Sequence, residues 1–162
     1  QLVRPFRSEV VRYDPNDMEY SKAGEYVYDH PFLWGSKRTG PDLHRVGGKY
    51  PDSWHYHHML DPTTMSPNSI MPPYEWLFYN VIDLDATAGK IKALRTVGVP
   101  YPVGYEETAN EDLLKQANEI VNTLSMDGIQ VLPEGEIVAL IAYLQRLGKD
   151  IKVKDETVTE AE

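Results

Sequence analysis

The stretch EGEIVALIAYLQRLG, residues 134–148, decides the fold class of this 162-residue chain. Its aliphatic side chains recur every three or four positions, which is the spacing of one face of an amphipathic helix. This face consists of Ile137, Leu140, Ile141, Leu144 and Leu147. Pro133 stands near the start of the pattern and Gly148 stands where a helix stop is expected. The sequence therefore predicts a strong closing helix.

Two more helices are predicted in the second half of the chain. Thr108 and Glu111 fit a capping box ahead of a second apolar face, which runs to Leu124. Another helix is expected over about 85–97, with small and aliphatic residues on its inner side. The second half is thus expected to be a helical scaffold.

The first half predicts only short helices, one over 53–60 that closes before Pro62 and one over 21–28. No convincing pair of alternating strands appears anywhere, so the fold class is mainly α. Beyond residue 148 the charged segment has no period and is predicted to be a tail, 149–162.

Composition excludes several classes of protein. The chain has no cysteine, so a disulfide framework, a cysteine zinc finger, a thiol nucleophile and a thioether-linked haem cannot be built on these residues. Its net charge of −9 argues against nucleic-acid binding, because phosphate neutralisation needs clustered Lys and Arg. The longest apolar run, Ile137–Leu144, is far shorter than the roughly 20 residues of a spanning helix. We therefore expect neither a membrane-spanning helix nor a signal peptide within it.

The first half carries the chemically active side chains, including all five histidines of the chain. His55 and His58 share a helix face, and Asp52 or Asp61 could join them in a zinc site. No HExxH or comparable spacing supports zinc, and partly buried or surface histidines are the ordinary interpretation. A zinc site at these histidines is therefore only a weak alternative.

A proline-stiffened segment, DPTTMSPNSIMPPYEW at 61–76, has no period yet carries apolar and aromatic residues. Such a loop usually folds over something. Met71 lies in its stiffest part, where a flexible thioether could be presented as a soft metal ligand. Taken alone, a loop methionine is more often core filler.

Several motifs in order resemble a class I cytochrome c domain: GPDL at 40–43, VGGKY at 46–50, SWHYHHMLDP at 53–62, SIMPPYEWL at 69–77 and the closing helix with Tyr143. A closer similarity is to the monohaem cytochrome c subunit of cbb3-type cytochrome c oxidases, or to the equivalent domain of a fused subunit. It is carried by RPFRSEVVRY at 4–13, DHPFLWGSKRTGPDLHRVGGKY at 29–50 and ALRTVGVPY at 93–101. This resemblance covers about residues 1–147.

The resemblance implies roles for individual residues. Met71 would be the distal ligand of the haem iron, a soft donor that raises the reduction potential. In the turn of Gly40 and Pro41, the proline carbonyl would accept a hydrogen bond from the proximal histidine. Leu43 and Ile70 would line the haem faces. Four residues are the candidates for holding the propionates: Arg38, Lys49, Tyr50 and Trp54. His55 and His58 would be surface residues or lie behind the residues that touch the haem.

The sequence departs from this family in one respect. The proximal histidine belongs to a CxxCH motif that the family places just before the segment corresponding to Gln1, together with an upstream membrane anchor. The resemblance therefore implies a class I cytochrome c-like domain without its first, haem-attachment helix, cut just after that motif. We expect the apolar face of 137–147 to be covered by a second copy of the chain or by rearranged helices. A natural homologue that has lost its haem is the competing explanation.

The function implied is electron transfer from a donor cytochrome c through one haem c toward the haem–copper subunit that reduces oxygen. The implied partners are that catalytic subunit, the other cytochrome c subunits and the donor, with no nucleic acid. The implied location is the periplasmic face of the bacterial inner membrane, with the piece itself soluble. Residues 1–148 would form one domain, with a loop-rich haem-pocket half at 1–80 and a helical half at 81–148. The alternative is a haem-free periplasmic interaction module on a degenerate cytochrome c fold.

Overall fold

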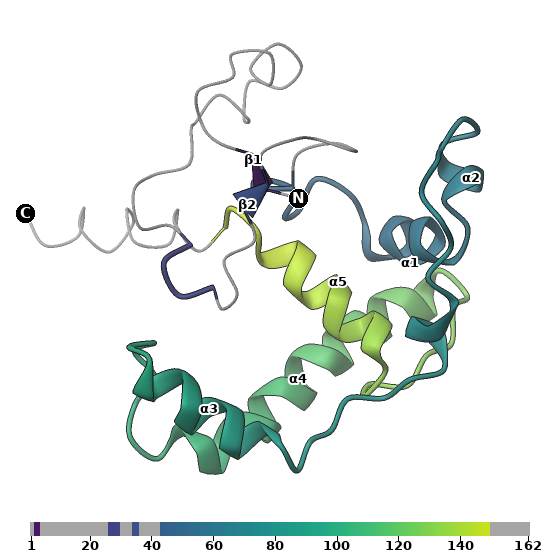
Figure 1. Ribbon diagram of the computed structural model, residues 1–162. Helices are drawn as coiled ribbons and strands as arrows, with labels where there is room; N and C mark the ends of the chain where they lie inside the picture. Colours follow the sequence, from purple (N-terminus) through teal and green to yellow (C-terminus); the bar gives the residue numbers. More distant parts are fainter. Residues whose placement is uncertain (1, 4–25, 30–33, 36–42, 150–162) are drawn as a thin grey trace, which may run out of the picture. The chain divides into compact units, whose positions relative to one another are not determined.

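The computed structural model describes residues 2–3, 26–29, 34–35 and 43–149 (Figure 1). The chain divides into two compact units. The first unit comprises residues 1–49 and 144–162, and the second comprises Tyr50–Tyr143. Each is described below by itself.

The described residues are mainly helical, as the sequence predicts. The helices are α1 (Asp52–Leu60), α2 (Pro62–Met65), the 3-10 helix η3 (Glu75–Phe78), α3 (Thr87–Thr96), α4 (Tyr105–Met126) and α5 (Glu136–Arg146). A two-residue parallel pair joins β1 (Leu2–Val3) to β2 (Trp34–Gly35). Strands of two residues are too short to show an alternating pattern, which is why the sequence does not reveal them.

The segment predicted to be irregular contains two short helices, α2 and η3. The Asp61 side chain caps α2 by accepting hydrogen bonds from the backbone N–H (2.9 Å) and hydroxyl (2.6 Å) of Thr63. Pro62 occupies the first helical position, where its missing N–H costs nothing. Helices of four residues contain no repeat, so periodicity cannot find them.

The predicted capping box at Thr108 is wrong, because α4 already begins at Tyr105. The residue before it, Gly104, has a φ of +88° and makes no side-chain cap. The turn between α3 and α4 is instead held by Arg95, which donates to the Pro102 carbonyl (2.8 Å) and pairs with the Glu106 carboxylate. The same guanidinium lowers the pKa of Glu106 to about 2. An ion pair in the first turn thus replaces the expected cap.

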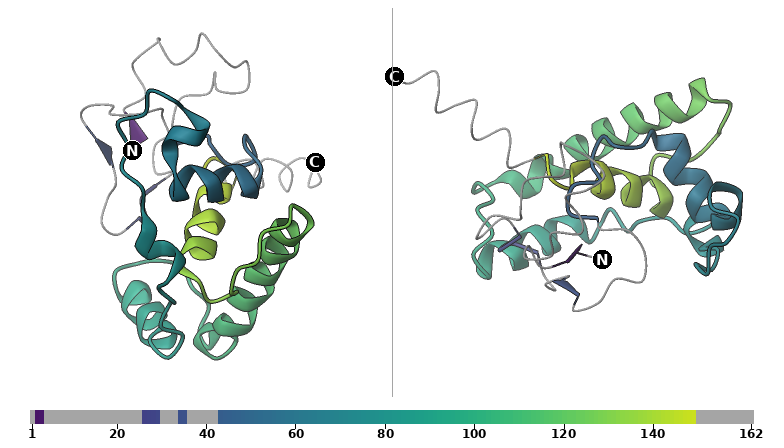
Figure 2. Two further views of the ribbon diagram at one scale, coloured as in Figure 1. Left: turned by 90° about the vertical axis from the view of Figure 1, so that its right-hand side faces the viewer. Right: turned by 90° about the horizontal axis from the view of Figure 1, so that it is seen from above.

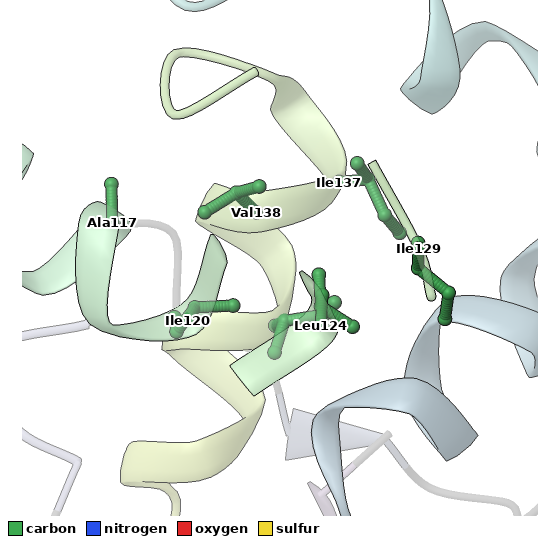
Figure 3. Packing of buried hydrophobic residues seen from close by; sticks show 7 residues of the cluster. Ala117, Ile120, Leu124, Ile129, Ile137 and Val138 are labelled. Atoms are coloured by element: carbon green, nitrogen blue, oxygen red, sulfur yellow. The ribbon is translucent and has the colours of Figure 1, made fainter. Parts of the chain in front are cut away.

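The hydrophobic core of the second unit lies between α4 and α5 (Figure 3). Leu124 and Ile141 are completely buried, and Val138 is nearly so. The predicted apolar face of the closing helix is therefore confirmed here for Ile137 and Ile141, against which α4 of the same chain packs, while the buried Val138 lies outside the predicted face. Tyr56 of α1 also packs on this core and meets Phe78 of η3 edge to face (5.0 Å between ring centroids). The core thereby fixes α1, which carries the candidate site.

On the other side of the second unit, α3 and α4 form a helical hairpin and lie side by side (Figure 2). Ile91 is the buried residue of α3, and Ala109 lies buried on α4. The predicted range of α3, about 85–97, is confirmed to within two residues at its start.

In the first unit, the VGGKY turn packs on the end of the chain's closing helix. The Gly47 N–H donates to the Leu147 carbonyl (3.0 Å), and the Gly48 N–H donates to the Gln145 side chain (2.8 Å). Gly148 has a φ of +82°, which confirms it as the helix stop. Of the helix predicted over 21–28, only residues 26–28 are described, and these form a turn.

Changing Gly47 to alanine is expected to destabilise the first unit by about 1–3 kcal/mol. A Cβ there would lie 2.5 Å from the Gln145 carbonyl oxygen and 2.7 Å from that of Leu147, and backbone cannot swing away as a side chain can. Gly89 is the matched control, because a Cβ added to it would meet nothing within 4 Å. Gly89→Ala should stabilise α3 by roughly 0.5–1 kcal/mol. Equal unfolding midpoints for the two variants in urea would contradict this packing.

Candidate functional site

The predicted site residues fall into three groups. Arg38, Gly40 and Pro41 lie outside the described residues. Leu43 is half-buried and Lys49 is exposed, both in the first unit. The third group, in the second unit, comprises Tyr50, Trp54, Ile70 and Met71.

Three rings form a stacked column along one side of α1. The Trp54 indole lies against the Tyr50 ring at 4.2 Å between centroids and against the His58 ring at 4.5 Å, with 16° between planes in both pairs. The three residues are spaced four apart, so each ring lies about one helical turn from the next. The column fixes the plane of the Trp54 ring. The spacing of four residues is the signal in the sequence that allows these rings to meet, although it does not fix the angle between them.

His55 is the most deeply buried polar side chain in the described part of the chain, with 2% of its surface exposed. Its ring stands edge-on to Tyr50 (6.1 Å) and to Trp54 (5.4 Å). Its Nε2 is buried and has no hydrogen-bond partner. Burial lowers the pKa of His55, while the nearby Asp52 carboxylate raises it and His58 lowers it. At neutral pH this imidazole is therefore uncharged.

The methionine segment is fastened to the end of α1. The Tyr74 N–H donates to the Met59 carbonyl (2.9 Å), and the Met71 N–H donates to the Ser69 hydroxyl (3.2 Å). Met71 is half-buried and is not among the side chains of the core cluster of the second unit. Ile70 beside it is 85% exposed. Within the described residues, this placement does not match the core-filler interpretation of Met71.

The zinc alternative is not supported by the geometry. No three His, Asp or Glu side chains of the described ranges gather closely enough to hold a metal ion. Asp61, one of the candidate ligands, is exposed and engaged with Thr63 in capping α2. His55 is turned into the ring cluster of Tyr50 and Trp54. The i, i+3 spacing of two histidines alone does not make a site.

The burial of His55 predicts acid sensitivity. Because burial lowers the pKa of this histidine, the unfolded chain binds a proton at higher pH than the folded chain does. The free energy of unfolding should therefore fall as the pH drops below about 6.5, down to the folded-state pKa. Urea unfolding at pH 7.5 and 5.5 measures the loss, which should be smaller in His55→Gln. The control His57→Gln alters an exposed histidine of the same helix and should keep the full loss. An equal loss in all three proteins would contradict the prediction.

No helix in the described part of the chain is both long and apolar enough to cross a membrane. In comparison with known families, the model for the mono-haem subunit of cytochrome c oxidase, FixO, matches residues 1–151. A search of curated proteins gave no match.

Proposed function

The chain belongs to the FixO family, the mono-haem subunits of cytochrome c oxidase, and we propose that it serves its oxidase as an electron-transfer domain. Its place would lie between a donor cytochrome c and the haem–copper subunit that reduces oxygen. This assignment requires no substrate pocket and no proton chemistry from the domain. Its residues need only hold the haem, orient it and set its potential.

The observation that carries the proposal is the placement of Met71. Its thioether belongs to a segment stiffened by Pro72 and Pro73 and bound to α1 through Tyr74 and Met59. The Met71 thioether is a soft sulfur donor that takes no part in the core cluster. Because its segment is stiff and is hydrogen-bonded to α1, it is a suitable ligand for a haem iron. We therefore assign Met71 as the distal iron ligand.

Other residues of the second unit also fit a haem. The buried Nε2 of His55 has no hydrogen-bond partner within the chain, so it is available to bond a group that is not protein. The 85% exposure of Ile70 suits a side chain that packs on such a group. When bound, the haem supplies a one-electron couple. Because the chain has no cysteine, the thioether bonds of a haem c cannot form within these 162 residues.

The remaining assignments follow the family resemblance. Leu43 would line the second haem face, and the Pro41 carbonyl would orient the proximal histidine from the turn that begins at Gly40. The propionates would be held by four residues: Arg38, Lys49, Tyr50 and Trp54. The stacked column supports the last of these, because it holds the Trp54 indole in one plane. The single cytochrome c-like domain at 1–148 belongs to the same proposal.

The proposed partners are the other subunits of the oxidase, at the periplasmic face of the inner membrane. A homo-oligomer through the closing helix stays a prediction. Ile137 and Ile141 are already covered within the chain, so this helix face does not require a second copy. Light scattering after size exclusion measures the state directly.

Expression of the chain preceded by the CxxCH motif that the resemblance implies, in a host that matures c-type cytochromes, tests the function. A low-spin haem spectrum is expected, together with rapid reduction by a ferrous donor cytochrome c under anaerobic conditions. Reoxidation should then require the haem–copper subunit and oxygen. A subunit purified from its native oxidase without haem would instead favour the haem-free interaction module.

A further inference from the structure

Among the buried side-chain atoms of the described residues that lack a hydrogen-bond partner, the Nε2 of His55 lies next to two of the residues assigned to the haem. The His55 side chain is only 2% exposed. Its Nε2 is buried and neither accepts nor donates a hydrogen bond. Leaving such an atom unpaired costs about 1–3 kcal/mol. An atom of this kind calls for an explanation, and a partner from outside the chain is one.

The surroundings of His55 indicate what that partner is. Tyr50 and Trp54, two of the proposed propionate-binding residues, both border its ring edge-on. From residue 50 to residue 89 the chain contains no Lys or Arg, so an anion bound there would depend on neutral donors such as an imidazole, a phenol or an indole N–H. α1 packs against α2, α4 and η3, and yet only Asp52 and His58, both on α1, act on His55 by charge.

We propose that the Nε2–H of His55 donates a hydrogen bond to a propionate carboxylate of the haem. The inference rests on the proposed function, since the acceptor belongs to the cofactor. The neutral imidazole would carry its single proton on Nε2 and donate it to the propionate. The hydrogen bond would draw negative charge away from the propionate and so favour the reduced haem.

The stacked column gives this contact its geometry. The Trp54 indole is stacked between the rings of Tyr50 and His58. The same indole lies beside the His55 ring, in an edge-on contact. Rotation of the His55 ring would change its edge-on contacts with Tyr50 and Trp54. A donor held in this way is oriented before the cofactor binds, which lowers the entropic cost of the contact.

The test compares three variants of the haem-bearing full-length subunit. His55→Phe keeps a ring but removes the donor, whereas His55→Gln keeps an amide N–H at a similar reach. His57→Phe is the matched control, because His57 is an exposed histidine of the same helix. Resonance Raman spectroscopy reports the propionate bending mode, and redox titration reports the reduction potential.

We expect His55→Phe to shift the propionate mode and to lower the reduction potential. His55→Gln should restore both toward the parent, and His57→Phe should leave both unchanged. If His55→Phe does not fold by circular dichroism, His55→Gln and His55→Asn form the test. The glutamine should keep the propionate mode, and the shorter asparagine should lose it.

Two results would overturn the inference. One is a propionate mode and potential unchanged in His55→Phe, or equal in the glutamine and asparagine variants. The other is loss of the low-spin spectrum in His55→Phe, which would make His55 an iron ligand instead. The proposed function fails separately, when the parent subunit itself binds no low-spin haem, or when its spectrum does not depend on Met71.

Discussion

Replacing Met71 by alanine in the haem-bearing subunit is expected to abolish six-coordinate low-spin ligation and to lower the reduction potential. The thioether stabilises the reduced iron, and axial ligands set haem potentials over a range of roughly 0.8 V. Each loss of about 59 mV lowers the equilibrium constant for electron uptake tenfold. Electron transfer from the donor should therefore fall by at least about tenfold. Optical spectra and redox titration measure the two effects.

Met65→Ala is the matched control for this experiment. Met65 ends α2, is half-buried like Met71, and lies in the same proline-rich segment. Its replacement should leave the spectrum and the potential of the subunit unchanged. A low-spin spectrum that survives Met71→Ala, or that is lost equally in Met65→Ala, would remove Met71 from the iron.

The second large effect is expected in the core between α4 and α5. Leu124 has no exposed surface and packs in the cluster with Ile137 and Ile141. Leu124→Ala should lower the free energy of unfolding by about 3 kcal/mol, because it removes buried methyl groups and leaves a cavity. Denaturation by urea, followed by circular dichroism, measures the change.

The control is the same substitution at Leu132, which is 64% exposed. Leu132→Ala should change the free energy of unfolding by no more than about 0.5 kcal/mol. If both leucine variants lost similar stability, the packing of α5 on α4 would not be the main support of the second unit.

The long helices could be predicted because their sequences repeat. α5 has an apolar face long enough to show its period, and Pro62 marks the end of α1 at the preceding residues. The start of α4 could not be predicted, because Arg95 and Glu106 come from different elements and meet only in the folded hairpin. A capping motif considers only residues close together in sequence, so it cannot include a partner such as Arg95 from the preceding helix.

The candidate site divides in the same way. Met71 could be proposed from the family resemblance, because chemistry alone makes a methionine in a proline-stiffened loop more often core filler. The role of His55 could not, since helical spacing places it on a face but does not reveal that its Nε2 is buried without a partner. The stacking of Trp54 on His58 likewise needs coordinates, because spacing allows a contact without fixing the angle between two rings.

The hydrogen bond between Gly48 and Gln145 joins residues 97 positions apart, and this separation has a consequence for the order of folding. Closing an unstructured loop of that length costs roughly 4 kcal/mol of chain entropy. The α3–α4 hairpin, by contrast, forms between neighbours in sequence, and its closure is cheap. The second unit is therefore expected to fold first. Its folding would shorten the unstructured chain that separates Gly48 from Gln145. Among the described residues, the VGGKY turn at 46–50 would then be the last to acquire its native contacts and the slowest to refold.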